Sequence, residues 1–286
     1  MRRTVLGRIF VLVLIVSLVT ACGGAATPSA PGAQRTSAAS GSTATLAPRV
    51  TGEIIVFADE LIVAAAADLR MTMEELVRVY QARTGIRVIV SYGSSGQLTQ
   101  QIESGAPFDV FLSADWGYIE RLRRGGHTVP GTEQRYARGR LALVTSPKFP
   151  RALHSLSDLR DPAIRYLAIA NPDHAPYGRA ARQALERSGL WEALQPKIVF
   201  GENILQTFQF VQTGQADAGL VALALALPGD MPWALIPQEL HEPIDQGLAA
   251  LRRTSREPTA RDFIAFVLSD EGQEILRRYG FESPSR

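Results

Sequence analysis

The segment Tyr92-Gly93-Ser94-Ser95-Gly96-Gln97 carries the residue types best suited to holding a ligand. It joins the end of an apolar run to the start of a helical period, and two glycines flank its two hydroxyl groups. Backbone N–H groups and serine hydroxyls at a helix N-terminus form an anion site, because the first N–H groups lack helical partners and the helix dipole is positive there. The alternative is a plain capped turn, since serine is a common N-cap residue.

Three other junctions between a strand and a helix could contribute to the same site. They are residues 64–69, where four alanines precede Asp68, residues 171–178, and residues 201–204. Small side chains let a ligand approach the backbone, although Asp68 is also explained as a helix N-cap. Four helix N-termini that follow strand ends are typical of an open α/β crevice that holds a ligand.

Motifs of enzymes and of metal centres are missing from the sequence. Residues 93–97 fail the nucleophile-elbow pattern at its fifth place, where Gln97 replaces glycine. No P-loop and no dinucleotide fingerprint is present. The four histidines, at positions 127, 154, 174 and 241, are scattered without the spacing of metal ligands. We therefore predict a binding protein and not an enzyme, with no catalytic residue and no cofactor.

The elements that must position these junctions alternate between short apolar runs and amphipathic segments. This alternation predicts an α/β fold in which mostly parallel sheets are flanked by helices. Expected strands are residues 54–57 or 61–66, 87–91, 110–113, 141–145, 166–170, 197–200 and 219–223. Expected helices are residues 69–83, 96–104, 178–188, 204–212 and 259–279, the last with a break at Gly272. Gly85 and Gly189 are expected at helix C-termini, and Asn203 as an N-cap.

Length, composition and charge exclude several classes of protein. The chain of 286 residues is 46% hydrophobic and 20% charged, which is typical neither of a disordered chain nor of a protein with many membrane spans. Of its 30 basic residues, three lie in the first 21 positions and two in the linker that follows, whereas none of the 28 acidic residues does. The foldable segment is therefore slightly acidic, which argues against nucleic acid as a partner.

The N-terminus indicates export and attachment to a membrane. Residues 1–21 combine two early arginines with an apolar run too short to span a bilayer comfortably, as in a signal peptide. The run ends at Val19-Thr20-Ala21-Cys22, which resembles a bacterial lipobox, and we predict lipidation of Cys22, the single cysteine. The alternative is an ordinary signal peptide with a chance cysteine. Residues 22–52 form a predicted flexible linker, which would hold an exported domain at the outer face of the cytoplasmic membrane or in the periplasm.

Several motifs resemble those of the periplasmic molybdate-binding proteins of ABC importers. They are residues 65–69, 92–98, 101–115 (QIESGAPFDVFLSAD), 171–174 and 278–281. The resemblance implies a two-lobed periplasmic-binding-protein-like fold, with the oxyanion held in a cleft between the lobes. It implies residues 53–136 plus 240–286 as the first lobe and residues 137–239 as the second, and it favours 61–66 as the first strand. We expect a monomer that delivers its ligand to an ABC importer permease.

The resemblance also assigns candidate ligand-binding positions. Members of the family hold the oxyanion with two serine positions, two backbone amides and a tyrosine hydroxyl. By motif match, Ser95 corresponds to the second serine, and Tyr177 and Ile204 to the residues that supply the amides. Asp68 occupies the first serine position and Ala222 the tyrosine position. We expect the Tyr177 hydroxyl to replace the one that is missing at Ala222.

Asp68 is the main difficulty for an oxyanion site, because a carboxylate is repelled by a dianion in a low-dielectric cleft. Its side chain could turn away to cap its helix, or it could be a direct ligand of the molybdenum or tungsten centre. A third reading is that the ligand is not an oxyanion. Our hypothesis retains molybdate or tungstate as the ligand. Its expected donors are Ser94, Ser95 and the backbone amides near Asp68, Tyr177 and Ile204.

Three other functions stay open at this point. The same fold could bind another anion, such as sulfate, phosphate or a small organic anion, since a fold does not fix its ligand. The chain could instead be a ligand-sensing module that docks to a signalling partner. A hydrolase that uses Ser95 as its nucleophile is the enzyme alternative, and it requires a histidine or an acid within reach of the hydroxyl.

Overall fold

The computed structural model describes residues 60–284. The predicted signal peptide, Cys22, the linker and the alternative first strand at residues 54–57 lie outside the described residues. Within residues 60–284, no helix has the length and apolar character needed to cross a membrane.

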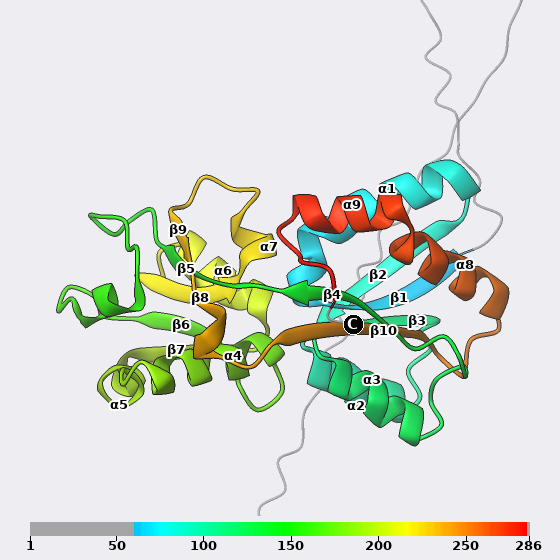
Figure 1. Cartoon of the computed structure of the whole chain (residues 1–286), viewed down its shortest axis with the longest axis horizontal. Helices are drawn as coiled ribbons and strands as arrows, with labels where there is room; N and C mark the ends of the chain where they lie inside the picture. Colours follow the sequence, from blue (N-terminus) through cyan, green and yellow to red (C-terminus); the bar gives the residue numbers. More distant parts are fainter. Residues whose placement is uncertain (1–59, 285–286) are drawn as a thin grey trace, which may run out of the picture. The chain divides into compact units, whose positions relative to one another are not determined.

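The first sheet has five strands in the order β2-β1-β3-β10-β4 (Figure 1). They are β1 (Glu60–Ala66), β2 (Arg87–Gly93), β3 (Val110–Ser113), β4 (Gln134–Gly139) and β10 (Ile244–Ala250). β1 pairs in parallel with β2 and β3, whereas β10 runs antiparallel to β3 and β4. Central strands that are buried on both faces require apolar runs. In β3 the first three residues are apolar, and all four are buried.

The second sheet repeats this arrangement with strands in the order β7-β6-β8-β5-β9. They are β5 (Leu141–Thr145), β6 (Leu167–Ala170), β7 (Ile198–Gly201), β8 (Ala218–Ala222) and β9 (Trp233–Leu235). β6 pairs in parallel with β7 and β8, and β5 runs antiparallel to β8 and β9. Each sheet is therefore mixed, with one strand that runs against the other four.

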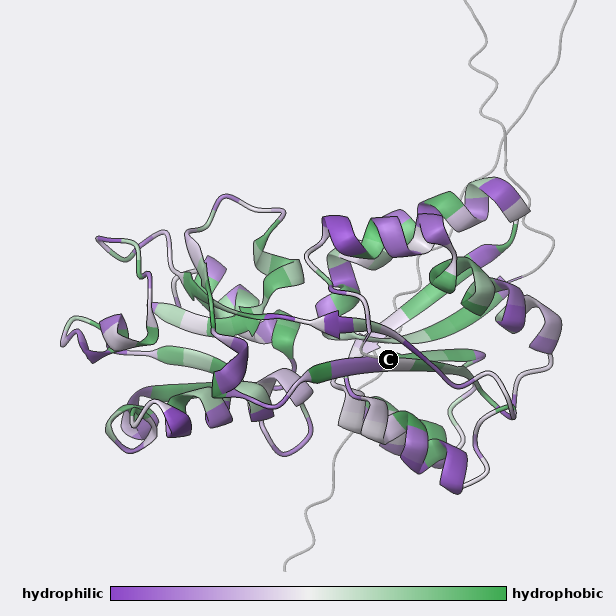
Figure 2. Cartoon of the chain, in the orientation of Figure 1, coloured by the Kyte–Doolittle hydropathy of each residue, from purple (hydrophilic) through white to green (hydrophobic). Residues whose placement is uncertain are grey.

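Helices cover both faces of the first sheet (Figure 1). On one face lie α1 (Arg70–Thr84), α8 (Glu257–Leu268) and α9 (Asp270–Arg278), and on the other lie α2 (Ser95–Glu103) and α3 (Trp116–Arg124). The second sheet packs with α4 (Pro176–Arg187), α5 (Trp191–Leu194), α6 (Ile204–Gln212) and α7 (Leu223–Ala226). Hydrophobic residues gather on the strands and on the helix surfaces turned toward them (Figure 2). We call the two sheets with their helices the first and second lobes.

The chain crosses between the lobes at Arg140 and again within residues 236–243. Glu282, close to the C-terminus, forms hydrogen bonds with both segments that join the lobes. It exchanges two backbone hydrogen bonds with Arg138, and its carboxylate accepts hydrogen bonds from Arg140 Nη1 at 2.5 Å and Gln238 Nε2 at 2.9 Å. The lobe limits expected from the resemblance stay predictions.

Most expected elements lie within a few residues of the observed ones, and β3, β5 and α6 have the predicted bounds. Among the described residues, the first strand is the 61–66 alternative. Asn203 caps α6 as predicted, and Gly85 and Gly189 both have positive φ after a helix. The sequence reading missed β4, β9, β10, α3, α5 and α7.

Two local predictions are wrong. Asp68 does not cap a helix, because it lies inside the short 3₁₀ helix Ala67–Leu69, which leads directly into α1. The C-terminal helical segment breaks at Ser269 and not at Gly272. The Ser269 hydroxyl accepts a hydrogen bond from the Gly272 N–H at 3.3 Å, so the serine starts a new helix where the previous one ends.

Candidate functional site

A small cavity lies where the junctions that follow β1, β2, β3, β6 and β7 meet. All five predicted ligand-binding positions lie among its lining residues, which are Ala66, Ala67, Asp68, Gly93, Ser94, Ser95, Ala114, Ala175, Pro176, Tyr177 and Ile204. The cavity leaves about 10 Å³ for the centre of a water molecule, which is about the space of one water. Both lobes supply lining residues, so the space lies between them.

Ser95 is held with its hydroxyl proton available. It is the first residue of α2 and is almost fully buried. Its Oγ accepts a hydrogen bond from the Ala114 N–H at 2.9 Å, which fixes the hydroxyl from the neighbouring junction. A serine hydroxyl has one proton to donate. Among the described residues, no acceptor takes a hydrogen bond from the Ser95 hydroxyl. The hydroxyl can therefore donate to a ligand in the cavity.

Two helix N-termini of the second lobe supply backbone donors. Pro176 is the first residue of α4 and has no N–H, so the first free N–H of that helix belongs to Tyr177. At α6, the side chain of Asn203 accepts hydrogen bonds from the second and third N–H groups, both at 3.0 Å. The cap leaves the first N–H, that of Ile204, without a partner in the helix. Both free amides belong to residues that line the cavity, where they suit an anion.

Ser94 joins the two lobes beside the cavity. Its Oγ lies 2.8 Å from His174 Nδ1 and 2.9 Å from Gln97 Oε1, so its single proton already has two possible acceptors. The Gly96 N–H donates to the His174 backbone oxygen at 3.0 Å. Gln97 Nε2 donates to Glu202 Oε1 at 2.8 Å, a third link between the lobes.

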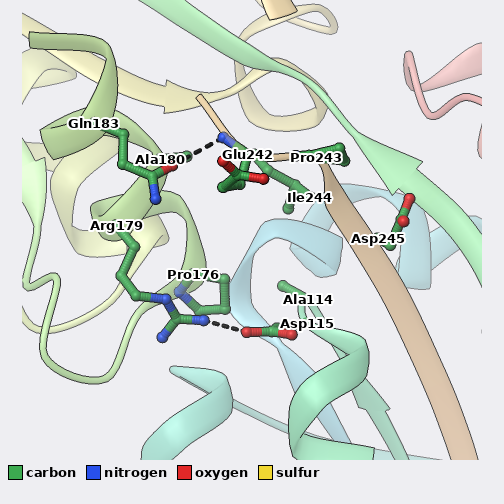
Figure 3. Close-up of a pocket in the computed structure, with 10 residues that line it drawn as sticks. All are labelled: Ala114, Asp115, Pro176, Arg179, Ala180, Gln183, Glu242, Pro243, Ile244 and Asp245. Carbon is green, nitrogen blue, oxygen red and sulfur yellow. Dashed lines mark hydrogen bonds and ion pairs between the residues drawn. The ribbon is translucent and has the colours of Figure 1, made fainter. Parts of the chain in front are cut away.

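A second, wider pocket of about 240 Å³ adjoins the cavity and shares Ala114 and Pro176 with it (Figure 3). In this pocket, the guanidinium of Arg179 points toward Asp115 and forms an ion pair that joins α4 to the start of α3 (Figure 3). Arg179 also donates to the Tyr118 hydroxyl at 3.2 Å. These contacts add a charged link between the lobes outside the cavity.

Asp68 is the centre of a buried hydrogen-bond network. Its Oδ2 accepts from Gln246 Nε2 at 2.5 Å, and the same nitrogen lies 3.2 Å from the Tyr177 hydroxyl. Gln246 Oε1 accepts from the Tyr136 hydroxyl at 2.5 Å. All four side chains are at most 1% exposed. In contrast, Asp68 Oδ1 is buried with no hydrogen-bond partner among the described residues.

Burial raises the pKa of the Asp68 carboxyl from 3.8 to about 6. The hydrogen bond from Gln246, the neighbouring Tyr177 hydroxyl and the nearby N–H groups of Asp68 and Leu69 offset only part of this effect. Burial, together with the charge of Asp68, raises the pKa of Tyr136 and of Tyr177 well above the usual value. Both phenols therefore stay protonated at neutral pH, and Asp68 is the group in this network that titrates near neutrality.

Gly139 makes room for the network. A Cβ at this position would lie 2.0 Å from the Tyr177 hydroxyl and 3.0 Å from Gln246 Nε2. Ala222, the expected tyrosine position, is buried at the end of β8 and is not among the residues that line the cavity. The Tyr177 hydroxyl lies instead against the Asp68 carboxyl and Gln246.

Sequence reasoning missed several residues of this region. Gln246 and Tyr136 lie on β10 and β4, which were not predicted, and no sequence signal linked His174 to Ser94. The available signal for Gln246 was a single amide inside the mostly apolar run from Ile244 to Leu251. Neither Gln246 nor Tyr136 stands near Asp68 in the chain, so only the fold reveals their contact.

Within residues 60–284, no group of three or more histidine, cysteine, aspartate or glutamate side chains is arranged to hold a metal ion. The nearest polar partners of the Ser95 and Ser94 hydroxyls are Ala114 N and His174 Nδ1 respectively. The hydrolase alternative requires a histidine or an acid on the Ser95 hydroxyl, and among the described residues neither hydrogen-bonds it. The geometry therefore fits ligand binding better than hydrolysis.

Comparisons with known proteins agree with this geometry. Residues 61–282 match the model of a family described as bacterial extracellular solute-binding protein. The molybdate-binding protein of Azotobacter vinelandii is 38% identical over 230 residues, which cover 78% of this chain and 90% of that protein. The molybdate-binding protein of Rhodobacter capsulatus is 35% identical over 226 residues, covering 78% of this chain and 88% of that protein.

A solved structure extends the likeness to three dimensions. The periplasmic molybdate-binding protein of Azotobacter vinelandii superposes with a TM-score of 0.75 at 33% identity, covering 79% of this chain and all of that one. The predicted two-lobed α/β fold and the resemblance to molybdate-binding proteins are thereby confirmed, as is the prediction of a binding protein and not an enzyme. The chain belongs to the family of bacterial extracellular solute-binding proteins.

Proposed function

We propose that this protein captures molybdate or tungstate in the cavity between its lobes and passes the oxyanion to an ABC importer. The observation that carries the proposal is the meeting of the Ser95 hydroxyl with the free N–H groups of Tyr177 and Ile204 around one small closed space. Hydrogen-bond donors and the positive ends of helix dipoles suit a small anion. The molybdate-binding relatives supply the identity of the anion.

The size of the cavity supports a compact ligand. Pockets for organic molecules usually enclose several hundred Å³, on the order of 300–1,000 Å³, whereas this cavity is closed around about 10 Å³ of free space. A tetrahedral oxyanion is larger than one water molecule, so the lobes must separate to admit it. The links of Ser94 and Gly96 to His174 would then form again around the bound anion.

We further propose that Cys22 carries the lipid anchor, and that residues 22–52 tether a monomer to the outer face of the cytoplasmic membrane or within the periplasm. The support is the Val19-Thr20-Ala21-Cys22 motif and the small-residue composition of the segment that follows. Labelling cells with a radioactive fatty acid tests the anchor. We expect label on the wild-type protein and none on Cys22→Ser.

Isothermal titration calorimetry of the full chain tests the ligand. We expect tight 1:1 binding of molybdate and tungstate, with much weaker binding of sulfate and phosphate. Preferred binding of sulfate or phosphate would show that the cavity binds an anion but that the anion is not molybdate or tungstate. Heat from none of the four anions would refute an oxyanion site altogether.

A further inference from the structure

One buried carboxylate oxygen of the site has no hydrogen-bond partner among the described residues. Asp68 Oδ2 accepts from Gln246, whereas Asp68 Oδ1 is buried without a partner among the described residues. A buried acceptor that forms no hydrogen bond is unfavourable, so native structures rarely retain one without a reason. A donor supplied with the ligand would satisfy it.

The position of Asp68 makes this acceptor relevant to the ligand. Asp68 is the single carboxyl among the residues that line the cavity. The other polar groups there, the Ser95 hydroxyl and the amides of Tyr177 and Ile204, are donors that suit an anion. An ionised Asp68 would repel the same anion, because two like charges in a low-dielectric space destabilise each other.

The groups packed around Asp68 cannot neutralise its charge. Gln246 on β10 is an uncharged amide, and Tyr136 on β4 and Tyr177 on α4 are phenols that stay protonated. On the α6 side the cavity is lined by Ile204, and on the α2 side by uncharged residues.

The basic side chains beside the cavity have other partners. His174, which is not among the lining residues, hydrogen-bonds Ser94, and Arg179 pairs with Asp115. No lysine or arginine is among the lining residues. A proton is therefore the available means of removing the repulsion.

We propose that the cavity binds its oxyanion together with one proton, which is shared between Asp68 Oδ1 and an oxygen of the anion. The inference rests on the proposed oxyanion site and adds the protonation state of the complex. The proton comes from solvent when the anion carries none, as with molybdate, and from the ligand when the anion is hydrogen phosphate. With the proton in place, Asp68 changes from a repelling charge to a hydrogen-bond donor.

In the protein without ligand, Asp68 can accept the proton. Burial raises the pKa of Asp68 to about 6, so at about pH 8 the carboxyl of the free protein is mostly ionised and gains its proton with the anion. Gln246 holds Oδ2 in place, which leaves Oδ1 as the oxygen that can share the proton.

Calorimetry in buffers with different heats of ionisation tests the proposal, because the slope of the observed heat against the buffer's heat gives the protons taken up. The full chain is titrated at about pH 8 with molybdate, tungstate, sulfate and phosphate. We expect an uptake of about one proton per molybdate or tungstate bound.

The variants Asp68→Asn and Asp68→Ser should bind molybdate without taking up a proton. Asp230→Asn, which alters an exposed carboxylate, should retain the proton uptake.

The outcomes separate this inference from the proposed function. Molybdate binding without proton uptake, or with uptake that persists in both Asp68 variants, would overturn the inference and leave the function intact. If phosphate binds and molybdate does not, the function fails. The inference then stands only if the Asp68 variants lose the preference for phosphate over sulfate. Binding of none of the four anions would overturn both.

Discussion

Ser94 and His174 face each other from the two lobes, with 2.8 Å between Ser94 Oγ and His174 Nδ1. The Gly96 N–H meets the backbone oxygen of the same histidine at 3.0 Å. The loop between β6 and α4 thus contacts the start of α2 through both a side chain and the backbone, immediately beside the cavity. These contacts belong to the closed arrangement of the lobes.

The close approach at Gly96 predicts a variant that resists closure. In Gly96→Ala, the added Cβ would lie 2.8 Å from both the His174 backbone oxygen and the Tyr118 hydroxyl, so the two lobes must separate slightly. We expect molybdate affinity to fall about tenfold or more, a loss of about 1.4 kcal/mol or more. Small-angle scattering with saturating molybdate should show a less compact protein.

Gly229→Ala is the matched control for Gly96→Ala, because the nearest atom to its added Cβ lies 3.8 Å away. It should bind and compact like the wild type. Wild-type affinity in Gly96→Ala would show that closure does not depend on this contact.

Ser95→Ala tests the hydroxyl donor. The variant loses one hydrogen bond to a charged ligand, so we expect molybdate binding to weaken by about 1–3 kcal/mol. It also leaves the buried Ala114 N–H without its acceptor, so thermal unfolding without ligand must be measured separately. Ser255→Ala, at an exposed serine, serves as the control. Unchanged affinity would remove Ser95 from the site.

Tyr177→Phe separates the hydroxyl of this residue from its backbone amide. The amide at the start of α4 is retained, whereas Asp68 and Gln246 lose a neighbour in the network. We expect a weaker affinity by about 1 kcal/mol, measured by calorimetry. Tyr166→Phe alters a half-exposed tyrosine and should have no effect. If Tyr177→Phe binds molybdate as tightly as the wild type, its hydroxyl does not replace the one missing at Ala222.

The raised pKa of Asp68 predicts a dependence of stability on pH in the ligand-free protein. The folded state holds the proton more tightly than the unfolded state, with a pKa of about 6 against 3.8. The contribution of this group to stability is therefore most favourable below pH 3.8 and declines as the pH rises to about 6. Above that, a constant destabilisation of about 3 kcal/mol remains.

Asp68→Asn removes this titration and keeps an acceptor for Gln246. We expect the free energy of unfolding of the variant relative to wild type to increase between about pH 4 and pH 6, as measured by urea denaturation, and to stay constant above. If the difference in the free energy of unfolding between variant and wild type does not change with pH, Asp68 has the same pKa in the folded and unfolded states.

Elements whose signals are local could be predicted from the amino-acid sequence. Apolar runs placed β3 and β5 at the correct residues, and Asn203 and Gly85 marked helix ends because capping depends on a few neighbouring atoms. The serines after β2 and the junctions at Asp68, Tyr177 and Ile204 were predicted to meet at one crevice, and the structure brings them together. The carboxyl ends of parallel strands lie at one edge of each sheet, which brings together the junctions within each lobe, whereas the meeting of the two lobes is a property of the whole fold.

Only the tertiary structure decided the environment of Asp68. Its partner Gln246 is 178 residues away, on a strand that pairs antiparallel with β3 and whose pattern was not recognised. Whether an aspartate caps a helix or is buried beside a ligand depends on desolvation, which is a property of all the chain packed around it. The local sequence supplied the carboxylate, and the fold supplied its burial, the amide that holds Oδ2 and the cavity that Asp68 lines.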